Sequence, residues 1–189
     1  MHSRRHLNTL KYRSTQSGVS VLDLLISTSI FCILTAIAIP SFKYVLKLKK
    51  QEVITHHTLR LLNYARQEAV NRTSRVILCA TENEQKCSSD WTNPLMVFVD
   101  QNENDELDQD ELLLRKETLL GTNQHLSWVS FGGKAYVGFN ESGTTGYQSG
   151  RIYYCDLSDP DRYKSQVIVY RTGRSRIAPK SELRGGCGD

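Results

Sequence analysis

The chain has 189 residues, enough for one domain with an appendage. Hydrophobic residues make up 39% and charged residues 23%, an ordinary balance that excludes a disordered or collagen-like chain. The formal net charge is +4, but four basic residues lie in the first 18 positions, so the rest of the chain carries 24 − 4 = 20 basic against 20 acidic side chains. A case for an anionic partner must therefore rest on local clustering.

The first predicted element is an apolar helix. Residues 24–42 contain no Asp, Glu, Lys or Arg, and these 42 − 24 + 1 = 19 residues would span about 28 Å as a helix, close to the ~30 Å hydrocarbon core of a bilayer. A signal peptide fits poorly, because the run is too long and has no small-residue cleavage site at its far end. A plain one-span anchor is the stronger rival, although it does not explain a polar leader that ends in Gly. We predict a membrane-spanning segment at about residues 20–42.

Asp23 lies near the start of this segment, where a carboxylate costs about 2.5–3.5 kcal/mol on insertion scales. Two interpretations stay open. At the membrane interface the charge is inexpensive and favours the helix N-terminus. After removal of the leader, Asp23 would instead pair with the free amino group of a neighbouring subunit and favour registered assembly of helices.

Residues 18–26 (GVSVLDLLI) resemble the processing site of type IV prepilins and pseudopilins. The resemblance implies that residues 1–18 are a leader, that a prepilin peptidase cuts between Gly18 and Val19, and that Val19 is then N-methylated. It also implies that Asp23 aids assembly with other pilins. Val19 replaces the usual Phe and Asp23 the usual Glu, and the shorter Asp bears on the strength of that pairing. Pro40 stands where pilin helices commonly carry a kinking Pro.

Residues 43–75 predict an amphipathic continuation, so that one helix covers residues 19–75. Apolar residues recur near helical spacing, and we interpret the basic residues between them as a solvated face. The apolar positions are Val45, Leu48, Leu59, Leu62, Ala65 and Ala69, and the basic ones are Lys47, Lys50, Arg60, Arg66 and Arg72.

From residue 76 to residue 189 the pattern changes to short apolar runs separated by turn residues, which predicts a β-rich head. The fold class is therefore α+β, with one long N-terminal helix packed on an antiparallel, β-rich globular head. The predicted strands are residues 76–80, 95–99, 112–117, 126–131, 135–139, 150–154 and 166–171.

The sequence has five cysteines. Cys32 falls in the apolar run and is expected to be a small buried hydrophobe. The other four form an even set that allows three pairings, in a head predicted to be periplasmic, where disulfides persist. We favour Cys79–Cys87, which closes a short polar loop, and Cys155–Cys187, which ties the C-terminal tail to a strand. A zinc site is the rival, but the sequence has no Cys-x-x-Cys and no His near this set.

Residues 100–111 form an acidic loop with oxygen-bearing side chains at the spacing of a calcium-binding loop. Position 6 should be Gly but is Asp105, and the flanks are predicted strands instead of helices. A metal-free, solvated hairpin loop is the alternative, and calcium is the one cofactor that the sequence raises. The predicted calcium ligands are Asp100, Asn102, Asn104, Glu106, Asp108 and Glu111.

The C-terminal tail is basic, with five cations and one acid, Glu182, in residues 171–184. Arg and Lys on a loop stapled by Cys155–Cys187 would suit phosphate oxygens and give salt-sensitive, sequence-independent binding. Gly173 would let the backbone turn so that two Arg side chains project on one side. An ordinary solvated loop, or pairing with a neighbour's acidic loop, is the alternative. The predicted DNA-binding residues are Arg171, Arg174, Arg176, Lys180 and Arg184.

The chain also resembles the FimT/GspH-like group of minor pilins and minor pseudopilins. The resemblance is carried by the order of Cys79, Trp91, residues 96–100 and residues 113–115, and again by residues 173–176 (GRSR). In FimT-like minor pilins the Gly-Arg-x-Arg segment is associated with DNA binding during natural transformation. This implies a single-pass inner-membrane protein with a periplasmic head, which assembles into a pilus, is exposed at the cell surface, and binds incoming double-stranded DNA.

The rival function is a minor pseudopilin of type II secretion, which contacts proteins and not DNA. An enzyme is not expected, because the sequence has no nucleophile and base at a motif spacing and no phosphate-cradling Gly loop.

Overall fold

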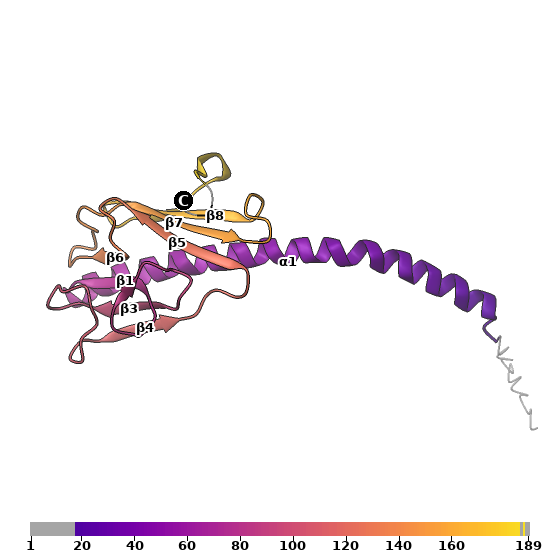
Figure 1. Ribbon diagram of the computed structural model, residues 1–189, viewed down its shortest axis with the longest axis horizontal. Helices are drawn as coiled ribbons and strands as arrows, with labels where there is room; N and C mark the ends of the chain where they lie inside the picture. Colours follow the sequence, from indigo (N-terminus) through magenta and orange to yellow (C-terminus); the bar gives the residue numbers. More distant parts are fainter. Residues whose placement is uncertain (1–17, 186, 188–189) are drawn as a thin grey trace, which may run out of the picture. The chain divides into compact units, whose positions relative to one another are not determined.

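The computed structural model describes residues 18–185 and 187 (Figure 1). The predicted leader therefore lies outside the described residues except for Gly18. The chain divides into two compact units, Met1–Lys43 and Tyr44–Asp189, which are described separately below. The elements are α1 (Val21–Arg72), β1 (Val76–Thr81), β2 (Cys87–Ser88), β3 (Leu95–Val99), β4 (Leu113–Glu117), β5 (Gln124–Ser130), β6 (Tyr136–Phe139), β7 (Gly150–Asp156), β8 (Lys164–Val169), β9 (Ser175–Ile177) and the 3₁₀ turn η1 (Lys180–Glu182).

In the first unit, the start of α1 exposes nearly all of its apolar side chains. Among the described residues, α1 is the one helix long and apolar enough to cross a membrane. Its hydroxyl groups bond within the helix: Ser27 Oγ donates to the Asp23 carbonyl at 2.7 Å and Thr35 Oγ1 to the Phe31 carbonyl at 2.9 Å. These bonds satisfy the two hydroxyl groups within the helix itself, as is required of a helix that spans the hydrocarbon core of a membrane.

In the second unit, the rest of α1 buries one stripe of side chains against the head. Leu62, Ala65 and Ala69 are buried as the helical spacing predicts, and the small Ala side chains let the sheets approach the helix closely. Val45 does not join this stripe, because it remains 48% exposed, before the buried face begins. The buried helix residues are Ile54, Thr55, Thr58, Leu61, Leu62, Ala65 and Ala69.

Two antiparallel sheets form the head and lie along this part of α1 (Figure 1). The first has the order β2-β1-β3-β4, and β6 pairs with β1 beside β2. The second has the order β5-β7-β8-β9, with Ile152 of β7 paired to Trp128 of β5 and to Val167 of β8. The predicted α+β architecture is confirmed. Strands β2 and β9 were not predicted, because segments of two and three residues carry too few side chains to show alternation.

The main core lies between α1 and the inner faces of both sheets. Alternate residues of β1 and β3 turn the other way and form a second, smaller cluster around Phe98 and Tyr136. Both strands are therefore buried on both faces, which accounts for their continuous apolar sequence. The buried apolar residues run from Ile54 to Ala178, so we expect the unit Tyr44–Asp189 to fold without residues 1–43.

Candidate functional site

Asp23 takes part in a reciprocal cap at the start of α1. The Ser20 backbone N–H donates to Asp23 Oδ2 at 3.1 Å, and the Leu22 N–H donates to Ser20 Oγ at 3.3 Å. This arrangement resembles a capping box, with the Ser20 hydroxyl on the second helical N–H instead of the third, and it satisfies backbone donors that a helix start leaves unpaired. Gly18 and Val19 lie exposed immediately before it. The contact agrees with the interpretation in which Asp23 favours the N-terminus of the helix. Pairing of Asp23 with a neighbouring subunit stays a prediction.

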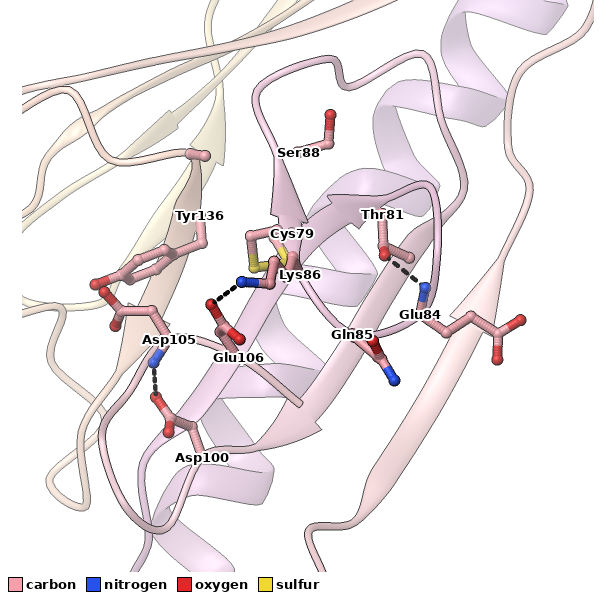
Figure 2. The surroundings of a disulfide bond; sticks show 12 residues. Cys79, Thr81, Glu84, Gln85, Lys86, Ser88, Asp100, Asp105, Glu106 and Tyr136 are labelled. Atoms are coloured by element: carbon pink, nitrogen blue, oxygen red, sulfur yellow. Dashed lines mark hydrogen bonds and ion pairs between the residues drawn. A yellow bond between two sulfur atoms is a disulfide. The ribbon is translucent and has the colours of Figure 1, made fainter. Parts of the chain in front are cut away.

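The structure joins the two cysteine pairs that the sequence favours. Cys79 of β1 bonds to Cys87 of β2, with Cα atoms 5.5 Å apart, and closes the loop between these strands (Figure 2). Within that loop the Glu84 N–H donates to Thr81 Oγ1 at 2.9 Å, and Lys86 forms a 2.8 Å ion pair with Glu106. The disulfide thus closes the loop at the edge of the first sheet, and the Lys86–Glu106 ion pair connects this loop to the acidic loop, residues 100–111.

Arg75 organises the acidic loop from its position just after α1. Its guanidinium pairs with the fully buried Asp100 and, at 2.6 Å, with Asp105. Asp100 also accepts the backbone N–H groups of Asn104 at 3.1 Å and Asp105 at 3.3 Å, the second of which Figure 2 shows. Burial alone would raise the pKa of the Asp105 carboxyl, but hydrogen bonds from Tyr136, Arg75 and Lys134 lower it below its ordinary value.

The calcium site stays a prediction, and the structure brings part of its predicted ligand set together. Within residues 18–185 and 187, no group of three or more His, Cys, Asp or Glu side chains is placed to share a metal ion. The oxygens of the predicted ligands have protein partners in this structure. Asp100 pairs with Arg75, Asp108 accepts the side-chain amides of Asn102 and Asn104 at 2.8 Å, and Glu111 accepts the Gln101 N–H at 2.7 Å. Glu106 faces Lys86.

Three of the predicted DNA-binding residues lie on or beside a tight turn, residues 170–174, which we call the Arg-rich turn. It connects β8 to β9 and is closed by the Gly173 N–H, which donates to the Tyr170 carbonyl at 2.8 Å. Arg171 and Arg174 are exposed on it. Tyr170, Arg174 and Arg176 share the wall of a cavity of about 300 Å³, so the two Arg side chains do project on the same side.

The Arg-rich turn rests on the end of α1 through a second loop. The Thr145 N–H donates to the Arg171 carbonyl at 3.0 Å, and Arg66 Nε of α1 donates to the Gly143 carbonyl at 2.9 Å. One backbone and one side-chain hydrogen bond thus connect the turn to the helix, so the exposed cations lie on a supported loop.

The described part of the tail, residues 178–185 and 187, lies on the face of the second sheet that points away from α1 (Figure 1). The buried Gln166 of β8 receives the Arg184 N–H and donates its own amide to the Arg184 carbonyl. Cys187 bonds to Cys155 of β7, with Cα atoms 5.6 Å apart. Lys180 and Arg184 are exposed on this segment. Arg176 is not a free cation, because its Nη2 pairs with Glu182 Oε2 at 2.7 Å.

A larger cavity, of about 630 Å³, lies beside the Arg-rich turn. Phe131 and Tyr147 line it and are 67% and 85% exposed. Polar side chains including Asp105 and Gln148 complete the wall. Sequence reasoning did not single out these aromatic residues. Tyr147 does stand between turn residues, where an aromatic ring has no strand or helix to pack it, and that position was the available signal.

Comparison with known proteins supplies a family. The profile of the family "Type II transport protein GspH" matches residues 55–173, which is 173 − 55 + 1 = 119 of the 189 residues. No curated protein sequence matches the chain.

Two solved structures share the fold, and a third matches less well. The type IV minor pilin FimU of Pseudomonas aeruginosa PAO1 is 16% identical over 74% of this chain and 96% of its own, with a TM-score of 0.53. A second crystal form of FimU is 17% identical over 72% and 98%, with a TM-score of 0.51. The minor pseudopilin EpsH from the Vibrio cholerae type 2 secretion system is 13% identical over 70% and 99%, with a TM-score of 0.49.

Proposed function

Because this chain belongs to the GspH family, within the type IV pilin superfamily, we propose that it is a minor pilin that binds DNA through the Arg-rich turn of its head. In this proposal it is a binding subunit and not an enzyme. It is cut by a prepilin peptidase between Gly18 and Val19, anchored in the inner membrane by the start of α1, and assembled with other pilins into a pilus. The head is exposed in the periplasm and then at the cell surface, where it assists DNA uptake in natural transformation.

The observation that carries the DNA proposal is the presentation of Arg171 and Arg174. Both are exposed on a turn that backbone contacts hold, and within the described part of the chain neither forms a salt bridge with a carboxylate. Arg guanidinium groups bind phosphate oxygens in a bidentate manner. Lys180 and Arg184 add charge from the covalently held tail. Such contacts bind the DNA backbone whatever its sequence.

A minor pseudopilin of type II secretion is the second candidate, and the family description favours it. Such a subunit shares the helix and the head but contacts proteins. The Arg176–Glu182 ion pair suits this candidate, since it removes one cation from the predicted DNA set. The two functions therefore differ in what the Arg-rich turn binds.

Fluorescence anisotropy with random-sequence duplex DNA tests the proposal. The unit Tyr44–Asp189 is the first sample, because residues 1–18 bring four basic side chains that would bind DNA themselves. The full chain in phosphatidylcholine nanodiscs is the second. We expect micromolar binding at 50 mM salt that weakens steeply at 200 mM, with values on the order of those of other nonspecific binders.

The matched variants are Arg171→Gln/Arg174→Gln and, as control, Lys50→Gln/Arg60→Gln, which removes the same charge from exposed positions on α1. The first should reduce the salt slope by about 1.8, or about 0.9 for each phosphate that is no longer neutralised, and the control should leave it unchanged. Absence of binding at 50 mM salt, or an equal decrease in both variants, would contradict the DNA proposal and favour the pseudopilin.

A further inference from the structure

Two large aromatic rings at the 630 Å³ cavity are exposed instead of buried. Phe131 follows β5 and Tyr147 precedes β7, and both line the cavity. The Phe131 N–H donates to the Ser149 carbonyl at 2.8 Å, so the two loops are hydrogen-bonded to each other. An aromatic ring in water forgoes a large gain from burial. A pair of such rings on held loops is suited to a flat ligand that covers them.

This aromatic cavity adjoins the Arg-rich turn. The Arg171 guanidinium lies 5.5 Å from the centre of the Phe131 ring, a cation–π distance. Thr145, which lines the cavity, donates its N–H to the Arg171 carbonyl. The guanidinium lies over one face of the ring, so a ligand stacked on the opposite face of Phe131 would have the proposed phosphate-binding cation nearby.

The wall of the cavity carries charges of both signs. Glu103 and Asp105 are acidic, while Arg75 and Lys134 are basic and both form ion pairs with Asp105. Carboxylates repel a phosphate but accept hydrogen bonds from amino and imino groups. Because both cations of the wall already pair with Asp105, the exposed Arg171 is the better partner for a phosphate, and the carboxylates suit a neutral ring with N–H donors. The volume is in the range of small-ligand sites, about 300–1,000 Å³.

We propose that this cavity binds an unpaired nucleotide, with its base stacked on Phe131 and Tyr147 and its phosphate against Arg171. The inference rests on the proposed DNA binding, since it names the form of nucleic acid that the same surface prefers. In a duplex the faces of the bases are covered by neighbouring bases, so they are not available to stack on the rings of Phe131 and Tyr147. A single strand, or a frayed or overhanging end, adds stacking to the phosphate contacts and gains about tenfold in affinity for each stacked base.

The test compares three probes of equal phosphate number: oligothymidylate, an abasic oligonucleotide, and a blunt duplex. The full chain in phosphatidylcholine nanodiscs is used, with the unit Tyr44–Asp189 in parallel. We expect oligothymidylate to bind at least tenfold more tightly than the abasic probe. Phe131→Ala and Tyr147→Ala should each remove most of this difference. Tyr147→Ala should also leave duplex binding within twofold, whereas Phe131→Ala additionally removes the cation–π contact of Arg171. Leu157→Ala, which removes an exposed apolar side chain elsewhere on the head, should change neither.

Photocrosslinking supplies a readout that does not depend on the variants. An oligonucleotide with one 5-iododeoxyuridine should crosslink to a peptide that contains Phe131 or Tyr147, as mapped by mass spectrometry. Equal affinity for oligothymidylate and the abasic probe, or crosslinks confined to other peptides, overturns the nucleotide site. If duplex binding through Arg171 persists in that case, the DNA proposal stands by itself. If none of the three probes binds, both proposals fail.

Discussion

Gly173 lies so close to Gly143 that a Cβ added at residue 173 would come within 1.8 Å of the Gly143 carbonyl oxygen. Gly173 also has a φ of +76°, which L side chains rarely adopt. The contact seats the Arg-rich turn on the loop that Arg66 of α1 holds. The position of the proposed DNA-binding cations thus depends on two residues that carry no side chain.

Gly173→Ala is expected to displace the Arg-rich turn and to destabilise the unit Tyr44–Asp189 by about 1–3 kcal/mol, because it adds both a clash and backbone strain. DNA affinity should fall even though every charge is retained. Urea unfolding and anisotropy measure the two effects. Gly146→Ala is the control, since Gly146 has a φ of +60° but no atom within 4 Å of an added Cβ. It should cost about 1 kcal/mol or less. Equal effects of the two variants would show that the Gly143 contact is unimportant.

Removing the Cys155–Cys187 bridge is expected to cost more stability than removing Cys79–Cys87. The sequence separations are 32 and 8 residues, and loop-closure entropy gives about 3.7 and about 2.5 kcal/mol. Cys79 and Cys155 are equally buried, so paired Ala substitutions lose similar packing. Guanidinium unfolding under non-reducing conditions measures the difference. After full reduction, both variants and the parent chain should have similar free energies of unfolding. A larger destabilisation from loss of the Cys79–Cys87 bridge would refute the estimate.

Asp105→Asn should destabilise the head near pH 7, and the destabilisation should shrink as the pH falls below about 3.8. The pKa of Asp105 is lowered in the folded state, so its contribution is present above the unfolded value near 3.8 and is lost as the pH falls through the folded value. At neutral pH we expect a destabilisation of about 1 kcal/mol for this partly exposed ion pair. Asn also tolerates the positive φ of 68° at this position. Thermal unfolding of the parent chain and of Asp105→Asn from pH 7 to pH 3 measures the difference in their stability. This difference must become smaller as the pH falls.

Asp23→Ala should leave leader removal intact and reduce incorporation into filaments, because it removes the charge proposed to pair with a neighbour's amino group. Asp23→Glu should retain assembly. Immunoblots of cell and sheared-filament fractions distinguish the two. Asp23→Asn separates capping from pairing, since Asn keeps an acceptor for the Ser20 N–H but has no charge. If the Asn variant assembles normally, the charge of Asp23 is not needed for assembly, and capping of the helix is its whole role.

Gly18→Leu is expected to block processing and to keep the leader attached. The uncut chain keeps a formal charge of +4, and the cut chain has 20 basic and 20 acidic side chains. Isoelectric focusing of membrane extracts should therefore show a basic form for the variant and a near-neutral form for the parent chain. A parent chain that focuses as the uncut form in cells with an active prepilin peptidase would count against cleavage at this site.

Local patterns were enough to predict the long helix and seven of the strands, because apolar runs and turn residues report burial directly. The same reasoning could not predict the contacts of Arg75, because its partners are distant in the sequence. Asp100, Asp105 and Tyr136 lie 25, 30 and 61 residues after it. The calcium spacing at residues 100–111 repeats a linear motif, but a guanidinium from outside the motif pairs with its first acid. The exposure of Phe131 likewise depends on where β5 ends relative to the neighbouring strands. The spacing of apolar residues in the sequence does not reveal this.

The covalent attachment of the tail determines how the head would carry mechanical load. Strand β9 pairs with β8 through three residues at the edge of the second sheet, an arrangement that tension on the tail would peel apart one bond at a time. The Cys155–Cys187 bond transfers the pull to β7, which is paired on both sides. A pull on the Arg-rich turn reaches α1 through the hydrogen bond from Thr145 to Arg171 and the hydrogen bond from Arg66 to Gly143. Force applied at the basic end of the head is thus shared between the interior of a sheet and the helix that links it to the rest of the chain.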